Sequence, residues 1–133
     1  MRQLKIDFDS IKPIYMQIAE AIEDEIIVGN LAEGSPVYSQ LILSRELGVN
    51  PATAAKGLSA LVQSRILEKQ RGQSMAVAAG AKSKLLADRR ANGFRAAVRG
   101  LVDEARKLEL PEERLIAMVH EYFTSGEGGS GNG

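Results

Sequence analysis

The chain has 133 residues, a net charge of zero at neutral pH and no cysteine. This length allows one compact domain with an appendage, and the lack of cysteine excludes disulfide frameworks and cysteine-based metal or redox chemistry. No apolar run approaches the ~20 residues of a membrane span, and the first residues have no signal-peptide core, so a cytoplasmic protein without a membrane partner is expected. Because a neutral chain does not by itself indicate nucleic-acid binding, the position of the charges has to decide that question.

The N-terminal part predicts an extended segment followed by one amphipathic helix. Residues 1–9 alternate apolar and polar side chains, as a short strand or a packed arm does. Ser10 is a candidate helix cap and Pro13 suits the first turn. The apolar stripe of the helix is expected to be isoleucines that recur every fourth residue, namely Ile18, Ile22 and Ile26. The acidic residues between 20 and 25 then form a solvent-exposed face that points away from phosphate.

The middle of the chain predicts two short helices joined by a tight turn. Ser39 is an N-cap of the first helix, and Gly48 can adopt the left-handed conformation that ends it. Asn50 caps the second helix, and Pro51 follows at the first helical position, where its missing N–H costs nothing. A helix-turn-helix of this kind places its second helix, here residues 51–65, in the major groove of DNA.

A short hairpin follows the two helices. Residues 66–69 and 75–77 have the character of strands, joined around Arg71 and Gly72. A helix-turn-helix with a hairpin after it is the layout of a winged helix-turn-helix, with residues 70–74 as the wing. An arginine at the tip suits the minor groove, because the negative potential attracts it and the neighbouring glycine lets the backbone approach.

The candidate DNA-binding residues are hydroxyls, amides and basic side chains at the helix starts, on the second helix and in the wing: Ser39, Gln40, Asn50, Thr53, Lys56, Arg71, Gly72 and Gln73. Such groups position a protein on phosphates, while long donors reach base edges. Plain capping is an equally good interpretation of Ser39, Asn50 and Thr53, and Lys56 has the alternative of an exposed lysine without a specific role. Residues 39–72 contain five basic and two acidic side chains, which leaves a local net charge of +3.

After Gly80 the pattern becomes a long helical one, and Pro111 begins a second helix. Gly93 and Gly100 lie inside the pattern and allow a bend or a close helix contact. Two helices bury too little area to be stable alone, so this region needs the winged domain or a second copy of itself. A homodimer also matches the two-fold arrangement of DNA half-sites. The expected interface residues are Phe94, Leu101, Leu115, Val119 and Phe123.

Three segments carry a family resemblance: PIYMQIAEAIEDEIIVGNLAEGSPV, SRELGVN and NPATAAKGLSALVQSRILEKQRG. They resemble the DNA-binding domain of GntR-family transcription factors, over about residues 8 to 110. The Asn-Pro opening of the second helix, the short chain and the region after Val77 look most like the YtrA subfamily. The resemblance implies a homodimeric repressor whose partner is a double-stranded, pseudo-palindromic DNA operator, and which often controls a nearby transporter operon.

Several positions depart from the family pattern. The arginine that the family usually places before the turn is Leu41 here, and Pro51 replaces an arginine that many relatives carry. The wing pattern R-G-x-G-x-F-V has Ser74 in place of the glycine and Ala76 in place of the aromatic residue. A charged contact, a glycine and an aromatic side chain are therefore replaced. These changes keep a second hypothesis open, a winged-helix protein-interaction module without DNA binding.

The expected fold class is mostly α with a small β wing, a winged helix-turn-helix followed by a C-terminal helical hairpin. Its expected parts are a DNA-binding domain over residues 1–79, a dimerisation region over 80–123 and a flexible tail over 124–133. Catalysis, metals and cofactors have no support, since the single histidine, His120, is best interpreted as a surface or packed residue. The possibility of a small-molecule effector is left open, and the dimer interface is the place where it could bind.

Overall fold

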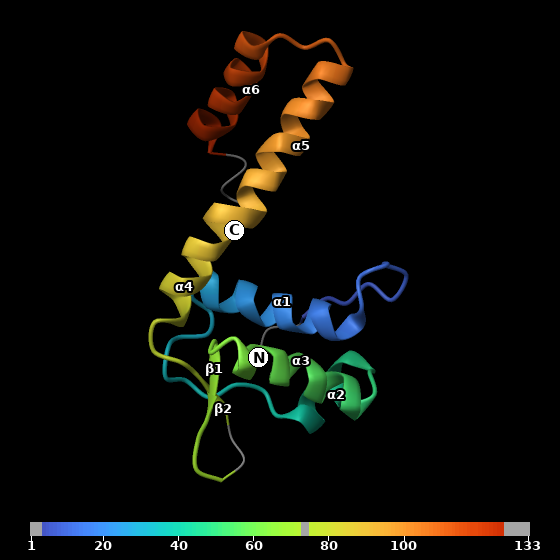
Figure 1. Cartoon of the computed structure of the whole chain (residues 1–133), viewed down its shortest axis with the longest axis vertical. Coiled ribbons are helices and arrows are strands. Elements are labelled where there is room, and N and C mark those ends of the chain that lie inside the picture. Colours follow the sequence, from blue (N-terminus) through green and yellow to red (C-terminus); the bar gives the residue numbers. More distant parts are fainter. Residues whose placement is uncertain (1–3, 73–74, 127–133) are drawn as a thin grey trace. The chain divides into compact units, whose positions relative to one another are not determined.

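The computed structural model describes residues 4–72 and 75–126, which form two compact units that divide between Asp88 and Arg89 (Figure 1). The first unit contains α1 (Ile14–Ile27), α2 (Gln40–Leu47), α3 (Pro51–Gln63), β1 (Leu67–Lys69), β2 (Met75–Val77) and α4 (Ala81–Asp88). The second unit contains the π-helical turn η1 (Arg89–Gly93), α5 (Phe94–Lys107) and α6 (Glu112–Ser125). The predicted fold class, a winged helix-turn-helix followed by helices, is confirmed. Within the described ranges, no helix is both long enough and apolar enough to cross a membrane.

Helix α1 supplies the central stripe of the first unit's core. Its three buried residues are the isoleucines of the four-residue repeat: Ile18, Ile22 and Ile26. The helix begins after Pro13, and Ser10 does not cap it; the Ser10 hydroxyl instead accepts a hydrogen bond from the Lys12 N–H at 3.1 Å. Upstream, the described residues 4–13 form a packed arm without a strand, and Leu4 is buried in the core. Gln17 anchors this arm because its side chain accepts from the Asp7 N–H at 2.8 Å.

The capping signals of α2 and α3 are confirmed. The Ser39 hydroxyl accepts from the Ile42 N–H at 3.2 Å, and Gly48 ends α2 with a φ of 68°. The Asn50 side chain accepts from the Ala52 N–H at 2.8 Å, directly before Pro51 at the first turn of α3. Helix α3 ends at Gln63 and does not reach residue 65 as expected, because Arg65 adopts a positive φ of 66°, which cannot continue a right-handed helix.

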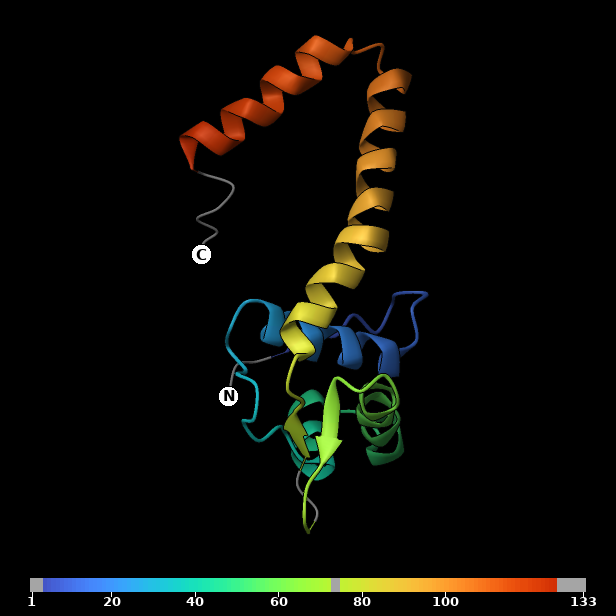
Figure 2. The same cartoon turned by 60° about the vertical axis from the view of Figure 1, so that its left-hand side comes forward.

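The hairpin pairs β1 with β2 in antiparallel register, with Leu67 opposite Val77 and Lys69 opposite Met75. Figure 2 shows the chain after β1 extending beyond the helices of its unit. Ala76 is fully buried and bridges to Pro36, so the position where the family pattern has an aromatic side chain is closed by the segment before α2. The small residue therefore fits a tightly covered site. Ser74, the other departure in the wing, lies outside the described residues.

Helix α4 belongs to the first unit, so this unit extends to Asp88 and does not end at residue 79 as expected. Ala81 and Leu85 are buried in the same core cluster as the isoleucines of α1. The Glu33 carboxylate caps the start of α4, accepting from the Gly80 N–H at 3.0 Å and from the Lys82 N–H at 3.2 Å. The core, and not the change of sequence pattern at Gly80, sets the boundary.

In the second unit, α5 and α6 present most of their apolar side chains to solvent. Ala105 is the only buried residue among the described residues of this unit. Gly93 ends the π-helical turn. A Cβ placed on Gly93 or Gly100 would meet nothing within 4 Å, so of the two possibilities at these glycines, a bend or a close helix contact, the structure forms no close contact. Helix α6 continues to Ser125, two residues into the segment expected to be a tail.

Candidate nucleic-acid interface

One face of α3 is free to meet a partner. The residues that point into the core of the first unit are Ala54, Gly57, Leu58 and Leu61. The residues that are exposed along the opposite side are Ala52, Lys56, Ser59 and Gln63. Their spacing of four, three and four residues keeps them on one face of a helix. This face offers an ammonium, a hydroxyl and an amide, which are groups that read base edges when a helix lies in the major groove.

Lys56 has a partner within the chain. Its ammonium lies 4.2 Å from the centroid of the Tyr15 ring, within the distance of a cation–π interaction. Tyr15 is in the first turn of α1, so the contact links two helices. The candidate base-reading lysine is thus held at the α1 edge of the exposed α3 face, a feature that the sequence pattern did not indicate.

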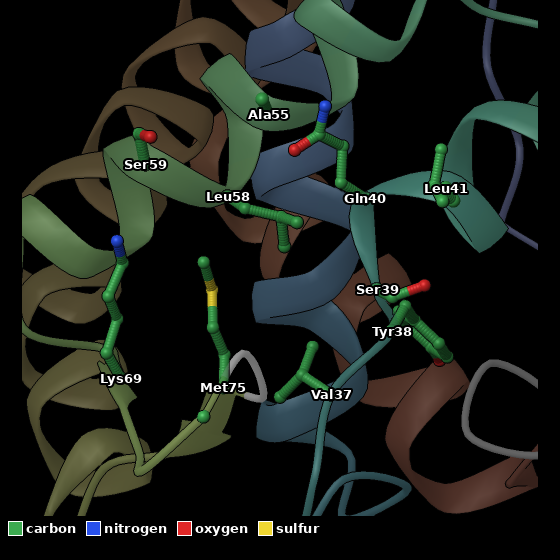
Figure 3. A pocket seen from close by; sticks show the side chains of 11 residues that line it. Val37, Tyr38, Ser39, Gln40, Leu41, Ala55, Leu58, Ser59, Lys69 and Met75 are labelled. Atoms are coloured by element: carbon green, nitrogen blue, oxygen red, sulfur yellow. The ribbon is translucent and has the colours of Figure 1, made fainter.

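A hollow of about 580 Å³ lies between α2, α3 and the hairpin (Figure 3). Its lining comprises Val37, Tyr38, Ser39, Gln40, Leu41, Ala55, Leu58, Ser59, Lys69, Gly72 and Met75. In Figure 3, Lys69 and Met75 extend from the hairpin toward α3, and Gln40 reaches across from the first turn of α2. The hollow combines apolar side chains with hydroxyl, amide and ammonium groups. This combination suits a sugar–phosphate backbone or the edge of a base, which present both kinds of surface.

The predicted DNA-binding residues fall into two groups around this hollow. Ser39, Gln40 and Gly72 line it, together with Lys69, Ser59 and Tyr38, which the sequence interpretation did not select. The period-two pattern of β1 and the α3 spacing from Lys56 to Ser59 were the available signals for the first two. Ser39 also caps α2, so its hydroxyl already has one hydrogen-bond donor.

The remaining predicted residues lie outside the lining of the hollow. Asn50 and Thr53 are in the first turn of α3, the former exposed and the latter half-buried. Arg71 is exposed at the hairpin, and Gly72 beside it has a φ of 82°, which suits glycine. Gln73 lies outside the described residues. The hollow, the α3 face and the hairpin therefore bring polar and basic groups of three elements to one region of the first unit.

Leu41 is 63% exposed at the rim of the hollow. The neighbouring Ile42 is 45% exposed but does not line the hollow. The position where the family resemblance implies an arginine is thus directed to the candidate interface, although it carries an apolar side chain. A purely apolar protein-binding surface would not require the lysine and hydroxyl groups that surround Leu41. These groups suit a polar, charged partner such as DNA.

A separate apolar groove of about 570 Å³ lies on the second unit, between α5 and α6. It brings together all five residues predicted for a dimer interface, along with further residues of both helices: Phe94, Ala97, Val98, Leu101, Val102, Leu115, Ile116, Val119, His120 and Phe123. His120 therefore lies at the edge of an apolar surface. Within the described residues, no group of three or more carboxylate, histidine or cysteine side chains is placed to hold a metal ion.

No protein-family model matches this chain. It is 29% identical over 119 residues to an uncharacterised HTH-type transcriptional regulator, YhcF, of Bacillus subtilis, covering 90% of this chain and 96% of that protein. A GntR family transcriptional regulator from Listeria monocytogenes has a similar structure, with a TM-score of 0.69 and 27% identity over 86% of this chain and 98% of that one. YtrA from Sulfolobus acidocaldarius, a GntR-family transcription factor, is 32% identical with a TM-score of 0.58, over 73% of this chain and 99% of that one.

These similarities extend across both units and are therefore not limited to the helix-turn-helix. The matched proteins are regulators of transcription. Together with the basic and polar groups around α3, they favour DNA as the partner of the first unit over the alternative of a protein partner.

Proposed function

The chain belongs to the GntR family of transcriptional regulators and is a DNA-binding regulator, not an enzyme. On this premise we propose that it is a homodimeric, cytoplasmic repressor of the YtrA-like subfamily, and that it binds a pseudo-palindromic operator. The observation that carries the proposal is the region where α2, the exposed face of α3 and the hairpin meet around one hollow. The subfamily is supported by the Asn50-Pro51 opening of α3 and by the similarity to YtrA.

In the proposed complex, α3 lies in the major groove and Arg71 enters the adjacent minor groove. Lys56 and Gln63 are long donors on the exposed face and would reach base edges. Ser39, Gln40 and the first N–H groups of α2 would bind phosphate, because the start of a helix favours an anion. Lys69 would meet the phosphate backbone from the hairpin side of the hollow.

The homodimer is supported by the surface of the second unit. The groove between α5 and α6 is lined almost wholly by apolar side chains. A second copy that covers it removes this apolar area from water, which stabilises the dimer. A two-fold dimer also presents two α3 helices to the two halves of a palindromic site. A dimer bound across a promoter excludes RNA polymerase from the DNA it covers, and this is the mode of repression that we propose.

Titration of the full chain against labelled DNA tests the proposal. The duplex is the sequence upstream of the chain's own operon, and a scrambled duplex of equal length is the comparison. We expect the upstream duplex to bind more tightly, with an affinity that falls steeply as salt is raised. Equal affinity for both duplexes at every salt concentration would contradict sequence-specific binding.

Lys69→Ala tests the hollow as a phosphate site. Because one charged contact is lost, the slope of log affinity against log salt should become shallower by about one. Lys12→Ala is the matched control, since Lys12 pairs with Glu20 of the acidic α1 face at 2.7 Å and should leave the slope unchanged. An unchanged slope for Lys69→Ala would remove this lysine from the interface.

A further inference from the structure

The contact between Tyr15 and Lys56 crosses from α1 to the exposed face of α3. The Lys56 ammonium lies 4.2 Å from the Tyr15 ring centroid, while Lys56 itself is exposed. Tyr15 is half-buried and belongs to a helix outside the helix-turn-helix. An aromatic ring from a supporting helix is therefore placed beside a cation on the helix that is proposed to read DNA.

The packing of α1 on α3 fixes this arrangement at the residue after Lys56. A Cβ built on Gly57 would lie 3.0 Å from the carbonyl oxygen of Tyr15 and 3.0 Å from Cγ2 of Ile18. Only glycine permits so close an approach without a shift of the backbone. Since Ile18 is fully buried, α1 has little freedom to move away, and the Tyr15 ring is held next to the position from which Lys56 projects.

A lysine side chain has four rotatable bonds and loses much of its conformational freedom when it binds a fixed partner. A side chain that is already restricted in the free protein loses less on binding, which increases affinity without any new contact. An exposed cation–π interaction is weak compared with a charged hydrogen bond to a phosphate or a guanine. The ring can therefore orient the ammonium without preventing its transfer to DNA, or can stay in contact with it while DNA is bound.

We propose that Tyr15 is a positioning residue for DNA recognition, which holds the Lys56 ammonium at the α1 edge of the α3 face before the operator is bound. This inference rests on the proposed function, in which that face of α3 lies in the major groove. In this proposal Tyr15 acts through Lys56, which adds a residue of α1 to the determinants of affinity and of base preference at the position that Lys56 reaches.

A double-mutant cycle on the full chain tests this inference. The variants are Tyr15→Leu, Lys56→Ala and the pair combined, with Tyr15→Phe as the control that keeps the ring. We expect Tyr15→Leu to weaken operator binding by about two- to fivefold and Tyr15→Phe to bind as the parent does. In the Lys56→Ala background, Tyr15→Leu should have no further effect, because the ring then has no cation to orient. Thermal unfolding of each variant shows whether it is folded. Tyr15→Met, whose flexible side chain can fill part of the space left by the ring, replaces Tyr15→Leu if the latter unfolds.

The outcomes separate the two proposals. If Lys56→Ala leaves operator affinity unchanged, Lys56 does not contact DNA, and both its proposed role and this inference are wrong. If Lys56→Ala weakens binding but Tyr15→Leu has no effect, or has the same effect in both backgrounds, the lysine contact stands and the positioning role of Tyr15 is refuted. Tighter binding by Tyr15→Leu would also overturn the inference, since the ring would then restrain Lys56 from reaching DNA.

Discussion

Leu41 is the residue at which this chain departs most clearly from the charge pattern of its family. It is 63% exposed at the rim of the hollow, close to the start of α2, and contributes no charge there. A long cation at this position would lie where phosphate is proposed to bind. The contacts proposed for this surface come from hydroxyl and amide groups, two lysines and Arg71, so a further cation at the rim is expected to add to the affinity.

Leu41→Arg should therefore strengthen operator binding and make the salt dependence steeper by about one unit of slope, because a phosphate contact is gained. Ile42→Arg is the matched control, since Ile42 is the next residue of α2, is 45% exposed and does not line the hollow. Titrations over a range of salt concentrations measure both variants. Equal effects of the two substitutions would indicate general electrostatic attraction and no specific contact at the rim.

At the scale of elements, α4 is the helix that connects the core of the first unit to the remainder of the chain. Its N-terminus is capped by Glu33, and the Lys84 ammonium donates to the carbonyl oxygen of Ser64, directly after α3. Buried Leu85 adds an apolar anchor. Three kinds of contact thus fix α4 to the loop before α2, to the end of α3 and to the core.

Glu33→Ala should lower the free energy of unfolding by about 0.5–2 kcal/mol, because the Gly80 and Lys82 N–H groups lose their acceptor at the start of α4. Glu33→Gln should cost less, since the amide oxygen still accepts one hydrogen bond. Urea unfolding monitored by circular dichroism provides the comparison. Unfolding curves for Glu33→Ala that match those of the parent would mean that the cap contributes nothing to stability.

The elements also show which structural features local sequence patterns predict correctly. The caps at Ser39, Gly48 and Asn50 depend on short-range geometry, and their predicted positions are those of the structure. The end of α3 differs from the prediction because the positive φ of Arg65 depends on how the chain enters the hairpin. The sequence does not show that α4 packs on the first unit for a related reason: Leu85 has the same helical spacing as residues of the second unit, and only the three-dimensional core reveals where it packs.

The residues of the candidate site also differ in how readily the sequence alone reveals them. Residues at helix starts, such as Ser39 and Gln40, could be selected because the chemistry of a helix N-terminus is visible in the sequence. Lys69 and Ser59 carry local spacing signals, but their place at the hollow depends on how the hairpin faces α3. The contact of Tyr15 with Lys56 joins residues that are 41 positions apart in the sequence, and it depends on the packing of α1 against α3.

At the scale of the whole molecule, the two units differ in how completely each buries its own apolar residues. The first unit has a continuous core that includes residues of α1, α2, α3, the hairpin and α4. Helix α6 of the second unit has no buried residue, and Phe123 is 82% exposed. A fragment that ends at Asp88 keeps the whole core of the first unit, whereas truncation after Gly80 would remove Leu85 from it.

If a second copy covers the groove between α5 and α6, a charge placed in that groove should separate the dimer. Val119 lines the groove and is 39% exposed, while Met118 beside it is 41% exposed and does not line it. We therefore expect Val119→Glu to be a folded monomer and Met118→Glu to remain a dimer in sedimentation experiments, because only the former buries an unpaired carboxylate in the interface. Val119→Glu, like the fragment ending at Asp88, should lose the gain of linked binding to two half-sites, often 10²–10⁴-fold. A parent chain that sediments as a monomer, or a Val119→Glu variant that binds the operator as tightly as the parent, would refute the dimer.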